Sequence, residues 1–500
     1  MNLASIIDGH PDDAVALVSR GRPTTYGELQ VQVAALRTSL AGLGIAPGDR
    51  VALLCANNWF FVVGWLAALG AGAEVVPLNP GSPAKELQAQ LAETDTRIVI
   101  AGPTGADAYN GVDRLAVPVE HVFVPEGSRV EAAEPIEPLF ELAAGADPAP
   151  VVDRAPDDVA LLMYTAGTSG SPKAAILTHG NLLSNLEQSD RVAGRSLTPD
   201  DVCLGLLPLF HIFGLNVVLD GALHKGASVV LVERFDPVDT LRTITDHGVT
   251  VVAAAPPVYV AWATMPGADR DALRTVRIVA SGAAKLPEEV AKAFEDRFDL
   301  TIAEGYGLTE ASPIVTTSVG GEPRFGSIGV PIPGVDVRLV DEDGEDVIEG
   351  DPGEIWVRGP NVFKGYLGDD EATRRVLTDD GWLRTGDVAI ADDDGWLWLV
   401  DRRKDLVIVS GFNVYPAEVE DVLRAHPGVA DAAVVGEPDP YSGERVKAFV
   451  VEEPGVHLEE DELVDYCLAH LARYKAPARV EVVDEIPRNA GGKALRRALR

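Results

Sequence analysis

The sequence predicts an α/β protein with a large N-terminal domain of layered, mostly parallel sheets, a β-rich closing subdomain and a small C-terminal α+β domain. Three observations indicate this class. The chain has 500 residues, more than the roughly 100–200 residues of a usual domain. Short apolar runs alternate with amphipathic stretches in the first part of the chain, and short strands separated by turn residues replace them later.

The predicted strands of the N-terminal domain are apolar runs bounded by turn residues. Amphipathic segments separate them; in 83–93, for example, Leu87 and Leu91 fall on one helical face. Strands that alternate with helices indicate βαβ units, and therefore parallel sheets. The runs occupy residues 51–56, 73–78, 97–101, 227–232, 249–254 and 276–280.

The later sequence predicts the closing subdomain and the second domain. After Glu322, short strands are separated by Gly, Pro and Asp turns, which is typical of a β-rich section. We place the domain boundary after residue 401, so that the two domains span 1–401 and 402–500. The C-terminal domain is predicted to contain a helix at 416–425 and strands at 406–410, 432–435 and 446–451.

Acidic residues outnumber basic ones, since 77 Asp and Glu against 42 Lys and Arg give a formal net charge of −35. The resulting field repels polyanions, so nucleic acid is not an expected partner. The N-terminus lacks the basic and apolar segments of a signal peptide. The longest uncharged apolar stretch, 59–73, is shorter than the ~20 residues that cross a bilayer. We therefore expect a cytoplasmic protein without an integral membrane segment.

Cysteine usage points to the same compartment. Cys55, Cys203 and Cys467 are far apart, so the sequence predicts neither a disulfide framework nor a zinc site. A reducing cytosol fits this usage. The oligomeric state stays open, with a homodimer as one candidate.

The segment YTAGTSGSPKAA, residues 164–175, carries the strongest local signal for chemistry. It follows an apolar run, so a strand is expected to lead into a backbone rich in Gly, Ser and Thr. Amide and hydroxyl donors in such a loop bind phosphate oxygens, and Lys173 adds a positive charge. A Walker A loop is excluded because Ser171 and Pro172 separate Gly170 from Lys173. An ordinary turn is the alternative interpretation of this segment.

This loop resembles the signature loop of the AMP-forming acyl-CoA synthetases, within the adenylate-forming superfamily. The resemblance implies activation of a carboxylic acid by ATP and Mg²⁺ to an acyl-adenylate, with release of pyrophosphate. Transfer of the acyl group to coenzyme A (CoA) would follow. Further blocks in the family's order are HGN (179–181), PLFHIFG (208–214), SGAA (281–284), GYGLTE (305–310), RTGD (384–387), DRRKD (401–405), GFNVYP (411–416) and PRNAGGK (487–493).

The resemblance assigns roles in nucleotide binding. Glu310 would hold Mg²⁺, which usually takes one or two carboxylates beside phosphate oxygens. Thr309 would hydrogen-bond the α-phosphate or the substrate carboxylate, and Tyr306 would lie against adenine. Asp387 would accept from both ribose hydroxyls, and Arg402 would donate to the same sugar. The full set of cofactor-binding positions is Thr165, Thr168, Ser169, Gly170, Lys173, Ser281, Gly282, Ala283, Glu304, Gly305, Tyr306, Gly307, Asp387, Arg402 and Gly411.

Lys493 follows two glycines near the C-terminus and is the expected catalytic cation, beside Thr309, Glu310 and His211. The substrate carboxylate and the α-phosphate are both negative, so they approach only if preorganised positive groups meet the developing charge. In the family the C-terminal domain is mobile and rotates about a hinge that corresponds to Lys404, after which Gly411 would line the pantetheine channel. Taken alone, Lys493 and Lys404 also read as ordinary surface lysines.

The acid pocket is expected at the PLFHIFG block and at the segment that follows it. By resemblance His211 borders the carboxylate, although a histidine between apolar residues is more often a satisfied core residue. None of the wall positions is Arg or Lys, so the pocket is expected to take an uncharged tail, and a medium- to long-chain fatty acid leads over a dicarboxylate. These positions are His211, Phe213, Val217, Gly305, Pro313 and Ile314.

Other interpretations stay open. The substrate is alternatively an aryl or cinnamate-type acid, and the acceptor a carrier-protein thiol; a non-catalytic nucleotide or acyl sensor is the least favoured reading. Ala166, Ser169 and Ala174 depart from the family's usual Ser, Thr and Gly in the phosphate loop. We expect these changes to alter nucleotide affinity rather than abolish activity.

Overall fold

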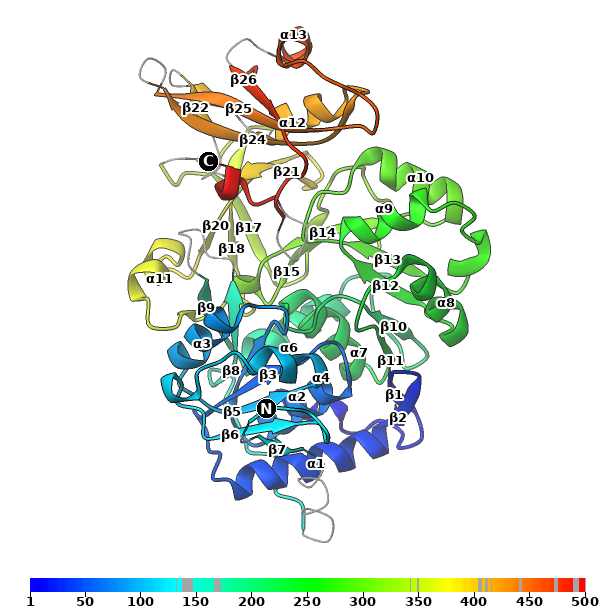
Figure 1. Cartoon of the computed structure of the whole chain (residues 1–500), viewed down its shortest axis with the longest axis vertical. Coiled ribbons are helices and arrows are strands. Elements are labelled where there is room, and N and C mark those ends of the chain that lie inside the picture. The colour runs from blue at the N-terminus through cyan, green and yellow to red at the C-terminus, as the bar shows by residue number, and fades with distance from the viewer. Residues whose placement is uncertain are drawn as a thin grey trace.

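Four β-sheets organise the described part of the chain (Figure 1). The computed structural model describes residues 1–131, 133–136, 147–165, 172–341, 343–348, 350–402, 407–409, 412–414, 416–439, 443–471, 475–488 and 494–499. Two large, mainly parallel sheets form the N-terminal part, and an antiparallel sheet connects them to a small C-terminal domain. The predicted α/β class with a small C-terminal domain is confirmed.

An eight-stranded sheet has the order β19-β9-β8-β4-β3-β5-β6-β7. Side chains of a strand alternate between its two faces: Val51 and Leu53 of β3 pack with helix α2, whereas Ala52 and Leu54 pack with α3 and α4. Its elements are β3 (Arg50–Leu54), α2 (Trp59–Gly70), β4 (Glu74–Leu78), α3 (Ala84–Glu93), β5 (Thr96–Ala101), α4 (Pro103–Tyr109), β6 (His121–Val124), β7 (Glu134–Pro135), β8 (Val159–Thr165), β9 (Lys173–Thr178) and β19 (Gly365–Tyr366).

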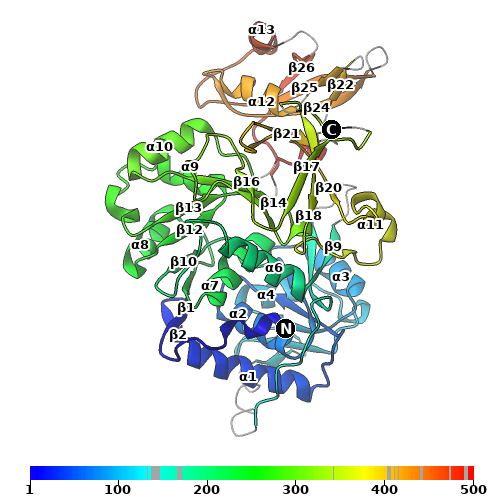
Figure 2. The same cartoon turned by 180° about the vertical axis from the view of Figure 1, so that it is seen from behind.

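A nine-stranded sheet has the order β16-β15-β14-β13-β12-β10-β11-β1-β2. Helices α8, α9 and α10 cover one face, and the shared core of the large domain covers the other (Figure 2). The elements are β1 (Val15–Ser19), β2 (Arg22–Thr25), α1 (Tyr26–Gly42), α6 (His179–Asp190), β10 (Val202–Gly205), the π-helical η3 (Phe213–Asp220), α7 (Gly221–His224), β11 (Ser228–Leu231), α8 (Pro237–His247), β12 (Val251–Ala254), α9 (Pro256–Thr264), β13 (Ile278–Ser281), α10 (Glu288–Phe298), β14 (Ala303–Gly307), β15 (Ile314–Thr317) and β16 (Val330–Pro331).

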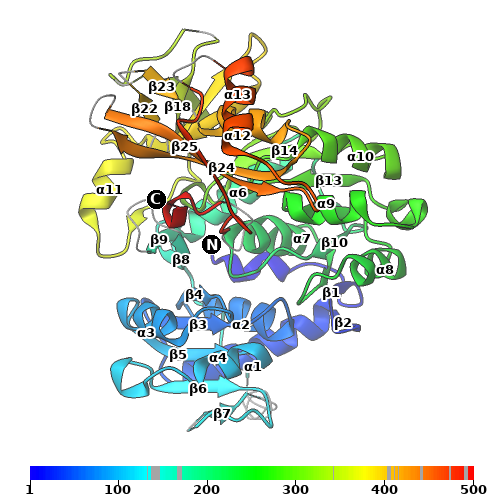
Figure 3. The ribbon, with the colours of Figure 1, turned by 45° about the horizontal axis from the view of Figure 1, so that its top comes forward.

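The closing subdomain and the C-terminal domain follow. The antiparallel sheet contains β17 (Asp336–Val340), β18 (Gly353–Arg358), β20 (Leu383–Ala391) and β21 (Leu397–Arg402), with α11 (Asp370–Val376) before β20. The C-terminal domain has its own apolar core and lies beyond the antiparallel sheet (Figure 3). Its elements are β22 (Val407–Val409), β23 (Phe412–Val414), α12 (Pro416–Arg424), β24 (Val429–Asp439), β25 (Gly443–Glu452), α13 (Glu460–His470), β26 (Arg479–Val482) and η7 (Arg496–Leu499).

The predicted elements agree with the structure to within a few residues. All six apolar runs of the N-terminal domain form strands, and 83–93 contains α3. The stretch 59–73 contains the buried helix α2. No helix in the described ranges has both the length and the apolarity needed to span a membrane.

Candidate active site

Parallel strands bring the predicted motifs to one edge of the nine-stranded sheet. Strands β10, β12, β13 and β14 run parallel, with Ser281 of β13 opposite Glu304 of β14. The segments that follow β10, β13 and β14 carry His211, Gly282 and Thr309 respectively. Because the carboxyl ends of parallel strands meet at one edge, residues distant in sequence share one crevice.

A cavity of about 1250 Å³ occupies this crevice, between the two large sheets, the antiparallel sheet and the C-terminal segment. Most of the predicted site residues that the structure describes line it. They are Thr165, Lys173, His211, Phe213, Val217, Ser281, Gly282, Ala283, Gly305, Tyr306, Gly307, Thr309, Glu310, Pro313, Ile314 and Asp387.

The remaining predicted residues are placed differently. Glu304 is not among the residues that line the cavity; its carboxylate accepts a hydrogen bond from the Leu286 N–H at 3.2 Å, and burial raises its pKa to about 7. Arg402 of β21 pairs with Asp387 of β20. This pairing places the Arg402 backbone beside Asp387, the residue predicted to bind the ribose. Thr168, Ser169, Gly170, Lys404, Gly411 and Lys493 lie outside the described residues.

Lys173 begins β9 directly opposite Thr165, the last residue of β8. This register brings the two ends of the phosphate loop together at the cavity. The Lys173 ammonium forms an ion pair with Asp369, which also caps α11 and accepts a hydrogen bond from the Ala372 N–H. The Lys173 ammonium holds the pKa of the Asp369 carboxyl below its ordinary value. An incoming phosphate therefore competes with Asp369 for Lys173.

Glu310 belongs to a short helical turn directly after β14, at the cavity wall. Its Oε1 accepts a hydrogen bond from the Tyr366 hydroxyl at 2.7 Å, and burial together with the Glu310 charge raises the pKa of that phenol. Within the described ranges no group of three or more His, Cys, Asp or Glu side chains is arranged to hold a metal. A lone carboxylate fits Mg²⁺, which takes its other ligands from substrate phosphates and water.

Tyr306 and Asp387 meet across the cavity from two different sheets. The Tyr306 hydroxyl donates to Asp387 Oδ2 at 2.7 Å, and Asp387 is only 7% exposed. Residues 281–283 line the same cavity. The aromatic ring and the nearby carboxylate therefore provide a surface for a flat base and acceptors for a sugar.

His211 is accessible from the cavity, so it is not the satisfied core histidine that its apolar neighbours suggested. The Phe213 N–H donates to its Nδ1 at 3.2 Å, which assigns the proton of the neutral ring to Nε2. Desolvation by the surrounding protein lowers the pKa of His211, although the ring stays accessible from the cavity, so the ring is neutral near pH 7. It can donate one hydrogen bond without adding charge.

The C-terminal segment reaches the cavity from the small domain. Ala494, Leu495, Arg496 and Ala498 contribute to the lining. Figure 1 shows this red segment extending from the C-terminal domain toward the large domain. Residue 493 therefore directly precedes cavity-lining residues.

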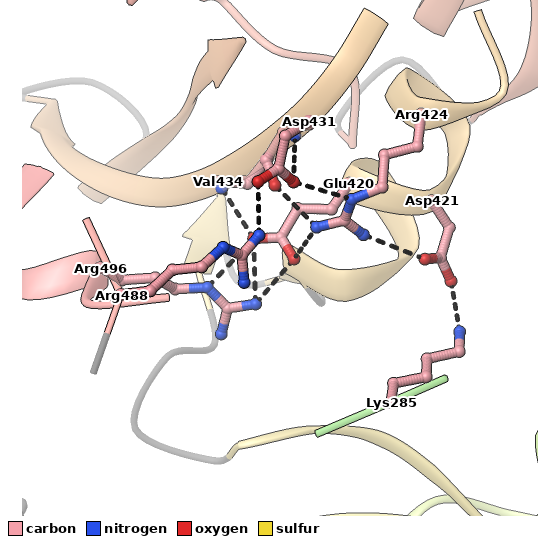
Figure 4. Close-up of polar contacts among 9 residues, drawn as sticks. Lys285, Glu420, Asp421, Arg424, Asp431, Val434, Arg488 and Arg496 are labelled. Carbon is pink, nitrogen blue, oxygen red and sulfur yellow. Dashed lines mark hydrogen bonds and ion pairs between the residues drawn. The ribbon is translucent and has the colours of Figure 1, made fainter. Parts of the chain in front are cut away.

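Ion pairs anchor the chain on both sides of residues 489–493 (Figure 4). Arg496 donates from Nε and Nη2 to the two oxygens of Glu420, each at 3.0 Å, and Glu420 is only 5% exposed. On the other side Arg488 pairs with Asp431 at the start of β24. The sequence indicated no separate role for either arginine, because their acidic partners are distant in sequence.

One ion pair links the two domains (Figure 4). Lys285, which lies between β13 and α10 in the large domain, places its Nζ 2.6 Å from Asp421 Oδ2 on α12. Both side chains are about half exposed, so the bridge is weak and breaks at low cost. Such a contact favours the observed domain arrangement without locking it.

The part of the cavity around the predicted acid pocket combines apolar and charged residues. The apolar wall is present, with the Phe213 ring packed so close to Gly282 that a Cβ there would lie 3.0 Å from it. However, Asp190, Arg195 and His224 also line the cavity. The predicted wall positions contain no Arg or Lys, but Arg195 reaches the same cavity from the loop between α6 and β10, outside the recognised motifs.

Comparisons with known proteins agree with this geometry. The family described as "AMP-binding enzyme" matches residues 4–367, and "AMP-binding enzyme C-terminal domain" matches residues 418–493. A feruloyl-CoA synthase from Amycolatopsis sp is 40% identical over 97% of this chain and 95% of its own. A long-chain-fatty-acid–CoA ligase from Yersinia pestis is 36% identical over 98% and 91%. The crystal structure of ATP-bound MatB from Rhodopseudomonas palustris superposes with a TM-score of 0.91 at 33% identity, covering 100% and 98%.

Proposed function

The chain belongs to the AMP-binding enzyme family and is an adenylate-forming acid–CoA ligase, and from this we propose how its residues divide two half-reactions. In the first, a substrate carboxylate attacks the α-phosphorus of ATP, giving an acyl-adenylate and pyrophosphate. In the second, the CoA thiol attacks the acyl carbonyl, giving the thioester and AMP. The observation that carries the proposal is the shared cavity of Lys173, Glu310, Tyr306 and Asp387.

Charge neutralisation is the main task of the first half-reaction, because two anions must approach one another. Lys173 exchanges Asp369 for phosphate oxygens, and Lys493 bridges the acyl oxygen and the α-phosphate. Glu310 would hold Mg²⁺, which would supply Lewis-acid stabilisation of the phosphate charge. Thr309 hydrogen-bonds the α-phosphate or the carboxylate. His211, neutral with its proton on Nε2, orients the carboxylate.

The nucleoside end of ATP uses the opposite part of the cavity. Asp387 accepts from the ribose hydroxyls, and Arg402 donates to the same sugar. Tyr306 packs against the adenine, with residues 281–283 on its other side. Support comes from the 2.7 Å hydrogen bond between Tyr306 and Asp387, which fixes the ring beside the carboxylate.

The second half-reaction requires a different arrangement, because the thiol must reach the carbonyl from the side that Lys493 occupies. We propose that the domain 402–500 rotates against 1–401 about Lys404, so that Gly411 lines the route of the pantetheine arm. The weak Lys285–Asp421 bridge supports this, since its loss costs little free energy. Lys404, the proposed hinge, lies outside the described residues.

The substrate class is the finer part of the proposal. Apolar walls at Phe213, Val217 and Ile314 accept either a medium- to long-chain fatty acid or an aryl acid of the cinnamate type. Relatives with either kind of name match the chain to a similar extent. Loading of a carrier-protein thiol is the second candidate for the acceptor, and it would require a carrier supplied as a separate chain.

A pyrophosphate-exchange assay tests the adenylation step. With a panel of fatty and aryl acids, we expect exchange of labelled pyrophosphate into ATP that depends on the acid and on Mg²⁺. Addition of CoA should release AMP and give a thioester detected by mass spectrometry. Exchange without any thioester would favour the carrier-protein acceptor, and binding of ATP without exchange for any acid would contradict the proposed function.

A further inference from the structure

The inner end of the acid compartment carries a positive charge that the adenylation chemistry does not use. Arg195 follows α6 and lines the same cavity as His211 and Gly305. Its backbone N–H donates to the Val192 carbonyl at 3.2 Å, which fixes the turn. Its side chain contacts the cavity from a loop that carries none of the family's motifs.

The pairing of β14 with β15 shows where the hydrogen-bond partner of Arg195 lies along the cavity. Arg195 Nη1 donates to Thr317 Oγ1 at 3.4 Å. Thr317 pairs with Gly305 across β15 and β14, whereas Ile314 pairs with Gly307 nearer the phosphate side. Three residues of a strand span about 10 Å. The hydrogen-bond partner of Arg195 therefore lies roughly that far along the sheet from the strand end that precedes Thr309 and Glu310.

The guanidinium is incompletely satisfied. It has five N–H donors, of which the described contacts use one, and across the described ranges it forms no ion pair with a carboxylate. Burial lowers its pKa to about 10, so it remains charged at neutral pH. A half-buried cation with most of its donors unused is unfavourable, and an acceptor supplied by a ligand lowers that cost.

The neighbouring charges offset the Arg195 charge only in part, since Asp190 attracts it but forms ion pairs with other cations. Asp190, the acidic group at this end of the cavity, pairs with Lys225 at 3.1 Å and with His224 at 3.5 Å. Although burial acts in the opposite direction, the hydrogen bonds from His224 and Lys225 hold the pKa of Asp190 below its ordinary value. Lys225 therefore balances Asp190, and the cluster keeps a net positive charge that matches one additional anionic or acceptor oxygen.

We propose that Arg195 is a specificity-determining residue that binds an acceptor oxygen at the far end of the acid substrate. The favoured substrate then has a carboxylate at one end and a second oxygen, from a carboxylate, hydroxyl or carbonyl group, about 10 Å away. A fatty acid with a plain methyl terminus leaves Arg195 desolvated and unpaired. The inference rests on the proposed function, because it assigns the substrate of the same site.

Matched pairs of acids test the proposal. One pair is 4-hydroxycinnamate and cinnamate, and the other is octanedioate and octanoate; each pair differs only at the far end. We compare kcat/KM for acid-dependent AMP formation in the wild type and in Arg195→Met, which keeps length but removes charge. Hydrogen bonds to charged groups predict a wild-type preference of about 10- to 100-fold for one polar-ended acid. The pair that shows it identifies the source of the oxygen.

Arg195→Met should abolish that preference while the apolar-ended acids keep or gain activity. Arg195→Lys should retain part of a preference for the dicarboxylate and lose more of one for the hydroxyl, because it keeps a point charge but not the planar fork. The control is Arg191→Met, one turn earlier on the exposed surface, where Arg191 lies 3.8 Å from Glu187. Its ratios should equal those of the wild type.

Two results would overturn the inference. One is a wild type that uses both members of each pair equally well; the other is an Arg195→Met variant that loses activity toward all four acids in proportion, as a merely structural residue would. Failure of the proposed function would look different from both results. No acid of either pair would then support AMP formation in any variant, although ATP would still bind.

Discussion

The contact between Arg496 and Glu420 leads to a specific kinetic prediction for Arg496→Met. Arg496 follows the segment that contains Lys493 and anchors it to α12 through two hydrogen bonds of 3.0 Å. Both side chains are largely buried, at 14% and 7% exposed. Loss of this anchor should displace the segment from the cavity. Fewer molecules would then have Lys493 in position for catalysis.

The magnitude follows from the partners that remain. Breaking a buried ion pair costs about 3–5 kcal/mol when the other charge is left alone. Glu420 keeps the Val434 N–H at 2.8 Å and Arg424 at 3.5 Å, so we expect a smaller loss. A loss of about 2 kcal/mol corresponds to a decrease of up to about 30-fold in the population with the segment in place.

The assay separates the half-reactions. Pyrophosphate exchange should slow by up to this factor in Arg496→Met, whereas thioester formation from supplied acyl-adenylate and CoA should change far less, because it does not need Lys493. Arg445→Met is the matched control, since Arg445 forms a more exposed ion pair with Glu437 in the same domain. An equal decrease in both half-reactions, or normal exchange in a variant that folds, would refute the positioning role.

Three further predictions concern charges in and near the cavity. Lys493→Ala should abolish acyl-adenylate formation but spare thioester formation from supplied acyl-adenylate; equal loss of both would contradict its role. Lys173→Met should weaken ATP binding measured by calorimetry, whereas Asp369→Asn should strengthen it by removing the competing carboxylate, and changes of the same sign would contradict the exchange of partners. Burial raises the pKa of Asp220 from an ordinary 3.8 to about 8, so the folded state holds this proton more tightly and stability falls as pH rises between these values. Asp220→Asn should therefore raise the urea midpoint more at pH 8 than at pH 5, and a pH-independent difference would refute this.

Local sequence was sufficient for the strands and for the two strand ends that flank the predicted phosphate loop. An apolar run such as 249–254 has few alternatives to a buried strand, and β12 forms there. In the same way, the segment before Lys173 had to connect two strand ends, and β8 and β9 pair up to Thr165 and Lys173. The departure at Ala174 lies within β9, opposite Tyr164, in an extended strand that accommodates a methyl group.

The acid compartment was predicted only in part. Phe213, Val217, Pro313 and Ile314 line the cavity as expected, because they lie in or next to motifs whose order along the chain follows the family. Arg195 was missed, since no periodicity or spacing connects it to Thr317, its hydrogen-bond partner. Only the pairing of β14 with β15 brings that partner to the pocket.

The sequence by itself therefore determined the fold class, the type of chemistry and a set of residues that line the cavity, because these depend on apolar periodicity and on short motifs with local backbone requirements. The tertiary structure alone decided which charges meet. Ion pairs such as Arg496 with Glu420 join residues 76 positions apart, and Coulomb interactions depend on distance in space and on burial, which linear spacing does not encode. The contact of Arg195 with Thr317 likewise joins residues that are distant in sequence.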